Sequence, residues 1–103
     1  MQMVVMGVVG AGLLLLVASP YRVSGNSMEP NYHDGQWLVV NKKSQLKVGD
    51  VVVLKYGNME LLKRIIRLEG DGFWVEGDNK DFSTDSREFG AVPKEAIVGK
   101  VGW

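Results

Sequence analysis

Residues 49–76 read GDVVVLKYGNMELLKRIIRLEGDGFWVE, and this stretch decides the fold. Three runs within it are rich in β-branched and large apolar residues, a composition that favours strands: Val51–Tyr56, Met59–Leu68 and Phe73–Glu76. The turn-forming pair Gly57-Asn58 separates the first two runs, which predicts a hairpin between them. Lys63 would then lie in the middle of a strand and not in a loop.

The strand pattern continues on both sides of this stretch. Three further runs are expected to be strands: Tyr21–Ser24, Trp37–Asn41 and Ile97–Val101. Residues 78–90, DNKDFSTDSREFG, are polar and rich in turn formers, which favours an ordered loop. Because helical periodicity is absent after residue 20, the sequence predicts a mostly β fold, a compact antiparallel β-sheet or barrel.

The three tryptophans, at positions 37, 74 and 103, are expected in the core of this fold. Small β domains need large apolar side chains to bury enough surface. A position at a membrane interface, which also suits aromatic side chains, is the alternative.

The N-terminal segment carries no charge through residue 21, and every residue from Met3 to Ala18 is apolar or Gly. Such a run covers most of the hydrocarbon thickness of a bilayer as a helix. We therefore expect a single-pass transmembrane anchor at residues 1–20, followed by a β-rich domain at residues 21–103. A buried helix and a cleavable signal peptide are the alternatives. The second is disfavoured because no Lys or Arg precedes the run and Pro20 would follow the cut.

The composition excludes several function classes. The 12 basic and 12 acidic side chains all follow the apolar run and balance each other, whereas a nucleic-acid-binding protein would show a basic excess. The chain has no Cys and a single His, His33, so a thiolate or histidine metal site is not expected. No cofactor is predicted.

Lys63 is unusual because it lies within the apolar segment LLKRII. Alternation along a strand places it on one face with Leu61 and Ile65. A buried ammonium is costly unless it is paired or neutral, so this setting favours a neutral amine. A lysine that protects an exposed sheet edge is the alternative.

Ser27 lies in SGNSMEP, residues 24–30, a segment that on its own is typical of a turn. Together with Lys63 it indicates a chemistry, since a serine hydroxyl needs a base and a neutral lysine amine can serve as one. The lysine pKa would have to fall from about 10.4 to about 7 or 8, roughly 4 kcal/mol. We expect desolvation by the surrounding apolar side chains to supply it: Leu61, Leu62, Ile65 and Ile66.

Four segments, in this order, resemble the conserved boxes of the type I signal peptidases, which are membrane-bound Ser-Lys endopeptidases. They are SGNSMEPNYHDGQWLVVNK (24–42), GDVVVLKY (49–56), LLKRIIRLEGD (61–71) and GDNKDFSTDSREFGAVP (77–93). The resemblance implies that Ser27 is the acylating nucleophile and Lys63 the general base. It further implies that Ser83 orients the lysine amine.

The resemblance also assigns supporting roles. It implies that three polar residues hold the loop around Ser83, with an ion pair between the last two: Asp78, Asp85 and Arg87. It places three residues at shallow substrate pockets for small side chains: Met28, Tyr32 and Leu62.

Two departures from the family pattern concern the oxyanion hole and the size of the domain. Some members have a Ser two residues before the nucleophile, where this chain has Gly25. The backbone N–H of Ser27 is therefore the expected oxyanion donor, with Gly25 or Ser24 as additional donors. The long β insertion of larger members is reduced here to residues 72–76.

The resemblance implies removal of signal peptides from secretory preproteins after small residues, with the domain on the extracytoplasmic side of the membrane. Arg22, Lys42 and Lys43 follow the apolar run, and by the positive-inside rule they favour the opposite orientation. Two other functions are compatible with the sequence. One is a self-cleaving repressor-type Ser-Lys protease, and the other is a non-catalytic β module anchored to a membrane.

Overall fold

The computed structural model of the chain describes residues 17–103. Most of the predicted anchor, residues 1–16, lies outside the described residues, so the anchor stays a prediction. Within residues 17–103, no helix has the length and apolar character that crossing a membrane requires.

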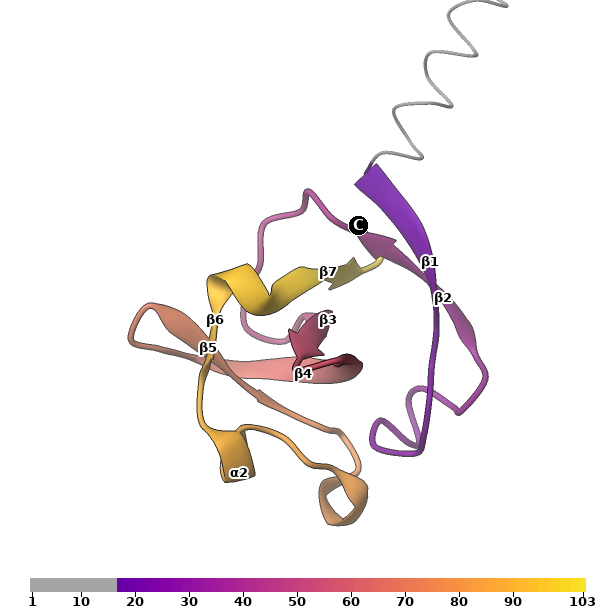
Figure 1. The fold of residues 1–103 in the computed structure, drawn as a ribbon. Helices are drawn as coiled ribbons and strands as arrows, with labels where there is room; N and C mark the ends of the chain where they lie inside the picture. Colours follow the sequence, from indigo (N-terminus) through magenta and orange to yellow (C-terminus); the bar gives the residue numbers. More distant parts are fainter. Residues whose placement is uncertain (1–16) are drawn as a thin grey trace, which may run out of the picture.

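The described chain forms one antiparallel sheet of seven strands (Figure 1). The strands are β1 (Ala18–Arg22), β2 (Trp37–Asn41), β3 (Val51–Tyr56), β4 (Met59–Glu69), β5 (Gly72–Glu76), β6 (Val92–Pro93) and β7 (Ile97–Val101). They are hydrogen-bonded in the order β1-β2-β7-β3-β4-β5-β6. Three short helices complete the described fold: η1 (Lys80–Phe82), α2 (Ser86–Phe89) and η2 (Lys94–Ala96).

The mostly β, antiparallel fold predicted from the sequence is confirmed. The predicted hairpin joins β3 to β4, with Tyr56 paired to Met59 and Val52 paired to Lys63. The sheet is open, since β1 and β6 are its two outer strands and do not pair with each other. The bounds of β2, β3 and β7 agree with the prediction, and β4 and β5 differ from it by one residue.

Strand β1 and the loop at residues 78–90 differ from the prediction. Strand β1 begins at Ala18, inside the range assigned to the anchor, and ends at Arg22. Pro20 lies within β1, which is an outer strand, where a residue without an N–H is tolerated. The loop contains η1 and α2, which are too short to produce a helical pattern in the sequence.

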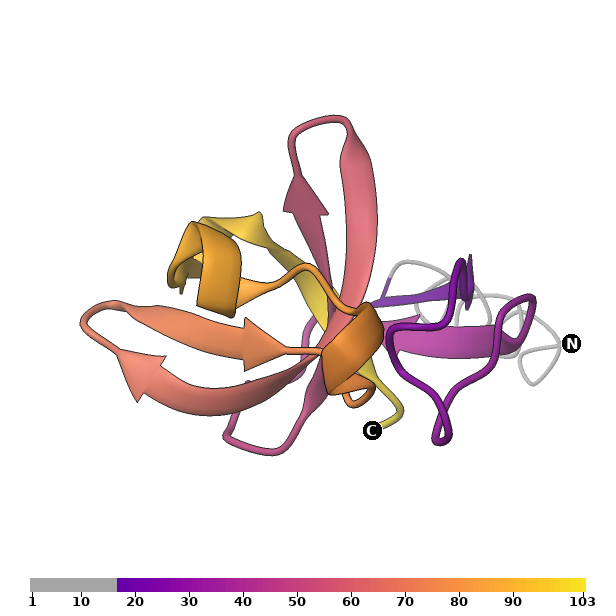
Figure 2. The same cartoon turned by 90° about the horizontal axis from the view of Figure 1, so that it is seen from below.

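The sheet buries apolar side chains on both faces, in two clusters. The turn-side cluster comprises Val23, Met28, Val40, Val51, Val53 and Leu62. The loop-side cluster comprises Val52, Leu54, Ile65, Phe73, Val75 and Val92. Consecutive residues of β3 alternate between the two, as side chains on a strand must. Figure 2 shows the result: β1 and β2 lie on one side of the β3–β4 hairpin, and β5 and α2 lie on the other.

The expectation that the tryptophans lie in the core is wrong for two of them. Trp37 is 65% exposed and Trp103 is 66% exposed, because one starts a strand next to an outer strand and the other follows the last strand. Trp74 is partly buried under the Arg67 guanidinium, 4.2 Å from its ring centroid, and its indole N–H donates to Glu76 at 2.7 Å.

The substitution Leu54→Ala tests the role of the loop-side cluster. Leu54 is fully buried, so we expect its truncation to lower the free energy of unfolding by about 2–5 kcal/mol. Leu68→Ala, at an exposed position on β4, is the matched control and should change it by less than about 0.5 kcal/mol. Urea unfolding followed by circular dichroism measures both, and equal losses would contradict the assignment of the core.

Candidate active site

Lys63 lies in the middle of β4 and is only 3% exposed. It faces the same side of the sheet as Leu61 and Ile65, which both pack in the loop-side cluster. Leu62 packs in the turn-side cluster, and Ile66 is 36% exposed where the pairing of β4 with β5 shifts. The prediction that Leu62 also desolvates the amine is therefore wrong, and a contribution from Ile66 stays a prediction.

The Lys63 amine is joined to a buried carboxylate through one serine. Lys63 Nζ lies 2.9 Å from Ser83 Oγ, and Ser83 Oγ donates to Asp85 Oδ2 at 2.6 Å. An ionised carboxylate accepts hydrogen bonds only, so the single proton of Ser83 is directed to Asp85. Ser83 can then only accept from Lys63. One N–H of the amine is therefore fixed on Ser83.

Asp85 is the most completely bonded polar group of the site. It is 0% exposed and receives the Gly77 amide at 2.8 Å and the Arg87 side-chain Nε at 2.9 Å. It also caps α2 by accepting the Arg87 backbone N–H. The ion pair expected between Asp85 and Arg87 is present. Burial alone would raise the pKa of the Asp85 carboxyl, but hydrogen bonds from Arg87, Ser83 and Gly77 outweigh burial and hold its pKa well below the usual range.

The pKa of Lys63 is lowered from its ordinary value. Desolvation by burial is the largest cause. The Asp85 carboxylate acts in the opposite direction and raises the pKa, while the positive charges of Arg87 and Lys80 lower it further. A neutral amine is thus favoured by the apolar cluster and by two nearby cations.

Ser27 lies in a turn that follows β1, and backbone bonds hold this turn against the segment after β5. The Asn79 N–H donates to the Ser27 carbonyl at 2.8 Å, and the Asn79 side chain donates to the Asn26 carbonyl at 3.0 Å. Gly77 permits the close approach. A Cβ at this position would lie 2.6 Å from the Ser83 Cβ and 2.7 Å from the Ser27 carbonyl oxygen. Ser27 and Ser83 therefore flank the same glycine.

Asp78 also holds the Ser27 turn in place through hydrogen bonds. It accepts two hydrogen bonds from the Arg64 guanidinium, both at 2.9 Å, and one from the Asn31 side chain at 2.9 Å. Its own N–H lies 3.4 Å from the sulfur of Met28. The bonds from Arg64, followed by that from Asn31, lower the pKa of Asp78 despite its partial burial. Asp78 thus ties strand β4 to both ends of the turn.

The sequence did not reveal the parts played by Asn31, Asn79 and Arg64. Each is of a residue type common in turns or on strand surfaces, and their partners are distant in the sequence. Alternation along a strand implies only that Arg64 faces away from Lys63. Its partner Asp78 could not be found from one sequence.

The role of Gly25 as an additional oxyanion donor stays a prediction. In the structure the Gly25 N–H donates to Asp34 Oδ1 at 2.7 Å. Gly25 has a φ of 86°, which explains why a glycine stands here. Among the residues predicted to line substrate pockets, Met28 and Leu62 are buried in the turn-side cluster and Tyr32 packs against it. Their contact with substrate stays a prediction.

Comparison with known proteins identifies the family. The model of the peptidase S24-like family matches residues 19–101. The chain belongs to this family. It is 33% identical over 105 residues to the mitochondrial inner membrane protease subunit 1 of Xenopus tropicalis, an alignment that covers 76% of this chain and 63% of that protein. It is 42% identical over 64 residues to the signal peptidase I of Bacillus amyloliquefaciens, covering 58% of this chain and 35% of that protein.

A third relative extends the same comparison. The signal peptidase IB of Staphylococcus aureus is 25% identical over 147 residues, covering 84% of this chain and 77% of that protein. These relatives confirm the predicted resemblance to type I signal peptidases and make this chain a serine peptidase at the level of its family. The chain spans less than two thirds of the length of the first two relatives.

The substitution Asp85→Asn tests the buried carboxylate. Because its folded pKa is depressed, Asp85 stabilises the fold fully above the pKa of an unfolded Asp, about 3.9, and this stability is lost as the pH falls toward the folded pKa. We expect Asp85→Asn to lower the free energy of unfolding by about 2–3 kcal/mol at neutral pH and by less at about pH 3. Urea unfolding at both pH values measures this.

The control is Asp81→Asn, which removes an exposed carboxylate from the same loop. It should leave stability nearly unchanged at both pH values. A loss in Asp85→Asn that is equal at both pH values would contradict the role given to its ionised form.

Proposed function

We propose that this chain is a Ser-Lys endopeptidase that removes signal peptides from secretory preproteins. The observation that carries the proposal is the buried Lys63 amine, held by Ser83, with its pKa lowered by an apolar setting. A strand lysine at an exposed edge would have none of these three properties. The site therefore favours a role for Lys63 as a general base over a role as a charge that protects a sheet edge.

In the proposed mechanism, neutral Lys63 accepts the proton of the Ser27 hydroxyl as its oxygen attacks the scissile carbonyl. The fixed N–H bond to Ser83 leaves the lone pair of the amine free to accept that proton. The backbone N–H of Ser27 stabilises the oxyanion. Protonated Lys63 then gives its proton to the leaving amine, and the neutral amine activates the water that hydrolyses the acyl-enzyme.

The substrate class comes from the relatives and the sequence together. Two relatives are named signal peptidases and a third is named an inner membrane protease subunit. Shallow pockets near Met28, Tyr32 and Leu62 would restrict cleavage to sites with small residues. The uncharged run at residues 3–18 would hold the domain at the bilayer, on the extracytoplasmic side, where such substrates emerge.

The names of the relatives favour this function over a non-catalytic β module and over a self-cleaving repressor. A serine-reactive acylating probe tests the non-catalytic alternative. Labelling of Ser27 would exclude it, because labelling requires an activated hydroxyl. Cleavage of a separate peptide substrate would exclude the self-cleaving repressor.

Ser27→Ala and Lys63→Ala are the primary test of the proposal. Each should lower kcat/KM for a signal-peptide substrate by at least about 10⁴-fold while the circular dichroism spectrum is retained. Thr84→Ala, which removes an exposed hydroxyl beside Ser83, and Lys55→Ala, on the same hairpin as Lys63, are matched controls that should keep full activity. Full activity in either primary variant would refute the assignment.

The pH dependence of kcat/KM tests the electrostatics of Lys63. Activity requires the neutral amine, so kcat/KM should rise with pH around a midpoint below the ordinary lysine pKa. Lys80→Gln removes a positive charge that lowers the pKa of Lys63, and the midpoint should therefore move to higher pH. Lys55→Gln, which removes a charge that does not act on Lys63, should leave the midpoint in place. A downward shift in Lys80→Gln would contradict this account.

A further inference from the structure

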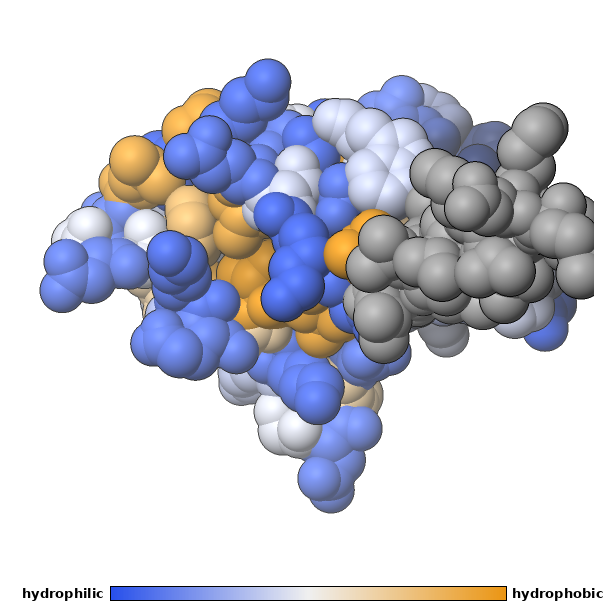
Figure 3. Space-filling view, turned by 90° about the horizontal axis from the view of Figure 1, so that it is seen from above, coloured by the Kyte–Doolittle hydropathy of each residue, from blue (hydrophilic) through white to orange (hydrophobic). Residues whose placement is uncertain are grey.

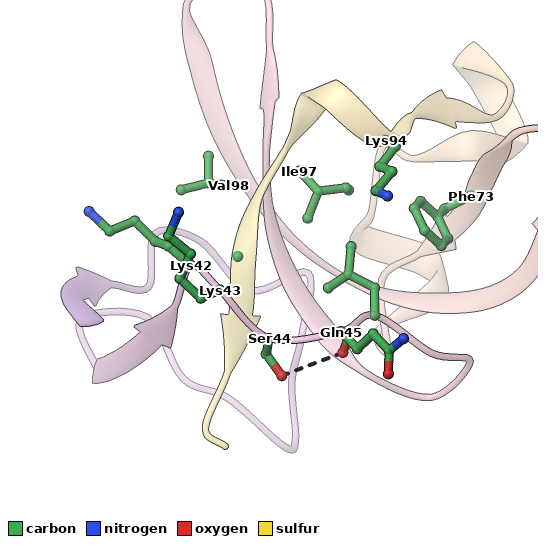
Figure 4. A pocket seen from close by; sticks show the side chains of 10 residues that line it. Lys42, Lys43, Ser44, Gln45, Phe73, Lys94, Ile97 and Val98 are labelled. Carbon is green, nitrogen blue, oxygen red and sulfur yellow. Dashed lines mark hydrogen bonds between the residues drawn. The ribbon is translucent and has the colours of Figure 1, made fainter. Parts of the chain in front are cut away.

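A cavity of about 470 Å³ lies apart from the candidate active site. It is formed between residues 42–46, which follow β2, and the segment from Lys94 through β7 (Figure 4). Its apolar lining consists of Leu46, Phe73, Ile97 and Val98. None of Ser27, Lys63 and Ser83 lines it. The cavity is therefore not part of the peptidase machinery described above.

Three lysines surround this apolar lining: Lys42, Lys43 and Lys94. In Figure 4, Lys42 and Lys43 lie at one end of the cavity and Lys94 lies toward the other, near Phe73. Among the described residues, no carboxylate lies within ion-pair distance of any of the three. By contrast, Lys80 pairs with Glu76 at 2.9 Å. The cavity thus combines unneutralised positive charge with an apolar interior.

The cavity lies on the side of the domain where the chain enters from its N-terminal segment. The Lys42 N–H donates to the Val17 carbonyl at 2.7 Å, and Ala18 pairs with Asn41. In Figure 1 the connection from β2 to β3, strand β7 and the C-terminus lie on this same side. The lysines that follow β2 are therefore close to the point where the uncharged run at residues 3–16 joins the sheet.

The surface around the cavity combines exposed apolar side chains with polar ones. Viewed from this side, hydrophobic surface is surrounded by hydrophilic residues (Figure 3). Exposed apolar side chains on the adjoining segments include Val39, Val48 and Trp103. Tryptophan is enriched at membrane interfaces, and lysine near a membrane surface is attracted to anionic lipid.

We propose that this cavity binds the phosphate headgroup of an anionic phospholipid, with the positive charge of the three lysines attracting the headgroup and the apolar lining contacting the adjoining hydrocarbon. The proposal rests on the membrane location in the proposed function. Lys42 directly follows Asn41, which pairs with Ala18 at the start of β1. A headgroup bound at Lys42 would therefore hold this end of the sheet at a defined orientation to the bilayer. The site would take lipid from the leaflet on the side of the β domain.

The experiment uses the full chain reconstituted in vesicles. The chain has no Cys, so a single cysteine at Gln45→Cys, on the cavity, carries an environment-sensitive fluorophore at one defined position. Asn58→Cys, at the tip of the β3–β4 turn, carries the same label as a control. Emission is measured as phosphatidylglycerol replaces phosphatidylcholine, and separately as inorganic phosphate is added to vesicles of phosphatidylcholine alone.

We expect a blue shift at Gln45→Cys that saturates with phosphatidylglycerol and is absent at Asn58→Cys. Each single substitution of Lys42, Lys43 or Lys94 by Gln should raise the half-saturating fraction of phosphatidylglycerol by about fivefold. The triple substitution should abolish the response. An equal response at both labels, a response that survives the triple substitution, or the same shift with inorganic phosphate would overturn the proposal.

Peptide cleavage in neutral detergent separates this proposal from the proposed function. The triple lysine variant should cleave a soluble signal-peptide substrate as fast as the unmodified chain, because none of the three lysines lies at the candidate active site. An unmodified chain that fails to cleave would refute the peptidase proposal, while the fluorescence response would still test the lipid site.

Discussion

The buried carboxylate of Asp85 is the interaction on which the candidate site depends. It receives hydrogen bonds from the backbone of Gly77, the hydroxyl of Ser83 and the guanidinium of Arg87. These groups come from the end of β5, the loop and helix α2. One anion thus replaces the regular backbone pairing that this irregular segment lacks. Without it, neither the direction of the Ser83 proton nor the position of the Lys63 amine would be determined.

The same arrangement balances two opposite effects on the pKa of Lys63. An ionised Asp85 close to Lys63 would favour a charged amine, and it does raise the lysine pKa. Arg87 pairs with Asp85 and opposes this effect, so the carboxylate can orient Ser83 with a reduced attraction for the proton of the amine. Orientation and protonation state are in this way controlled by different residues.

The sequence was informative wherever a local pattern determines structure. Strands β2, β3 and β7 and the β3–β4 turn follow from β-branched runs and the Gly57-Asn58 pair, and the burial of Lys63 follows from strand alternation. Features that depend on distant contacts were not predictable. The bond from Asn79 to Ser27 spans two separate loops, and the use of the Gly25 N–H by Asp34 depends on the fold of a turn.

Burial of individual large side chains was also hard to predict. Trp37 and Trp103 are exposed because an open sheet with short outer strands covers few positions near its ends. Residue type indicates a preference for the core, whereas the position of a residue within the sheet decides whether a partner covers it.

The position of β7 has a consequence for how the domain is made. This strand lies between β2 and β3, so it joins the half of the sheet that carries the Ser27 turn to the half that carries Lys63. During synthesis, β3, β4 and β5 can pair as successive hairpins, but the two halves gain their shared strand only after residues 97–101 have left the ribosome. The nascent chain would therefore remain without an assembled candidate site until β7 is in place.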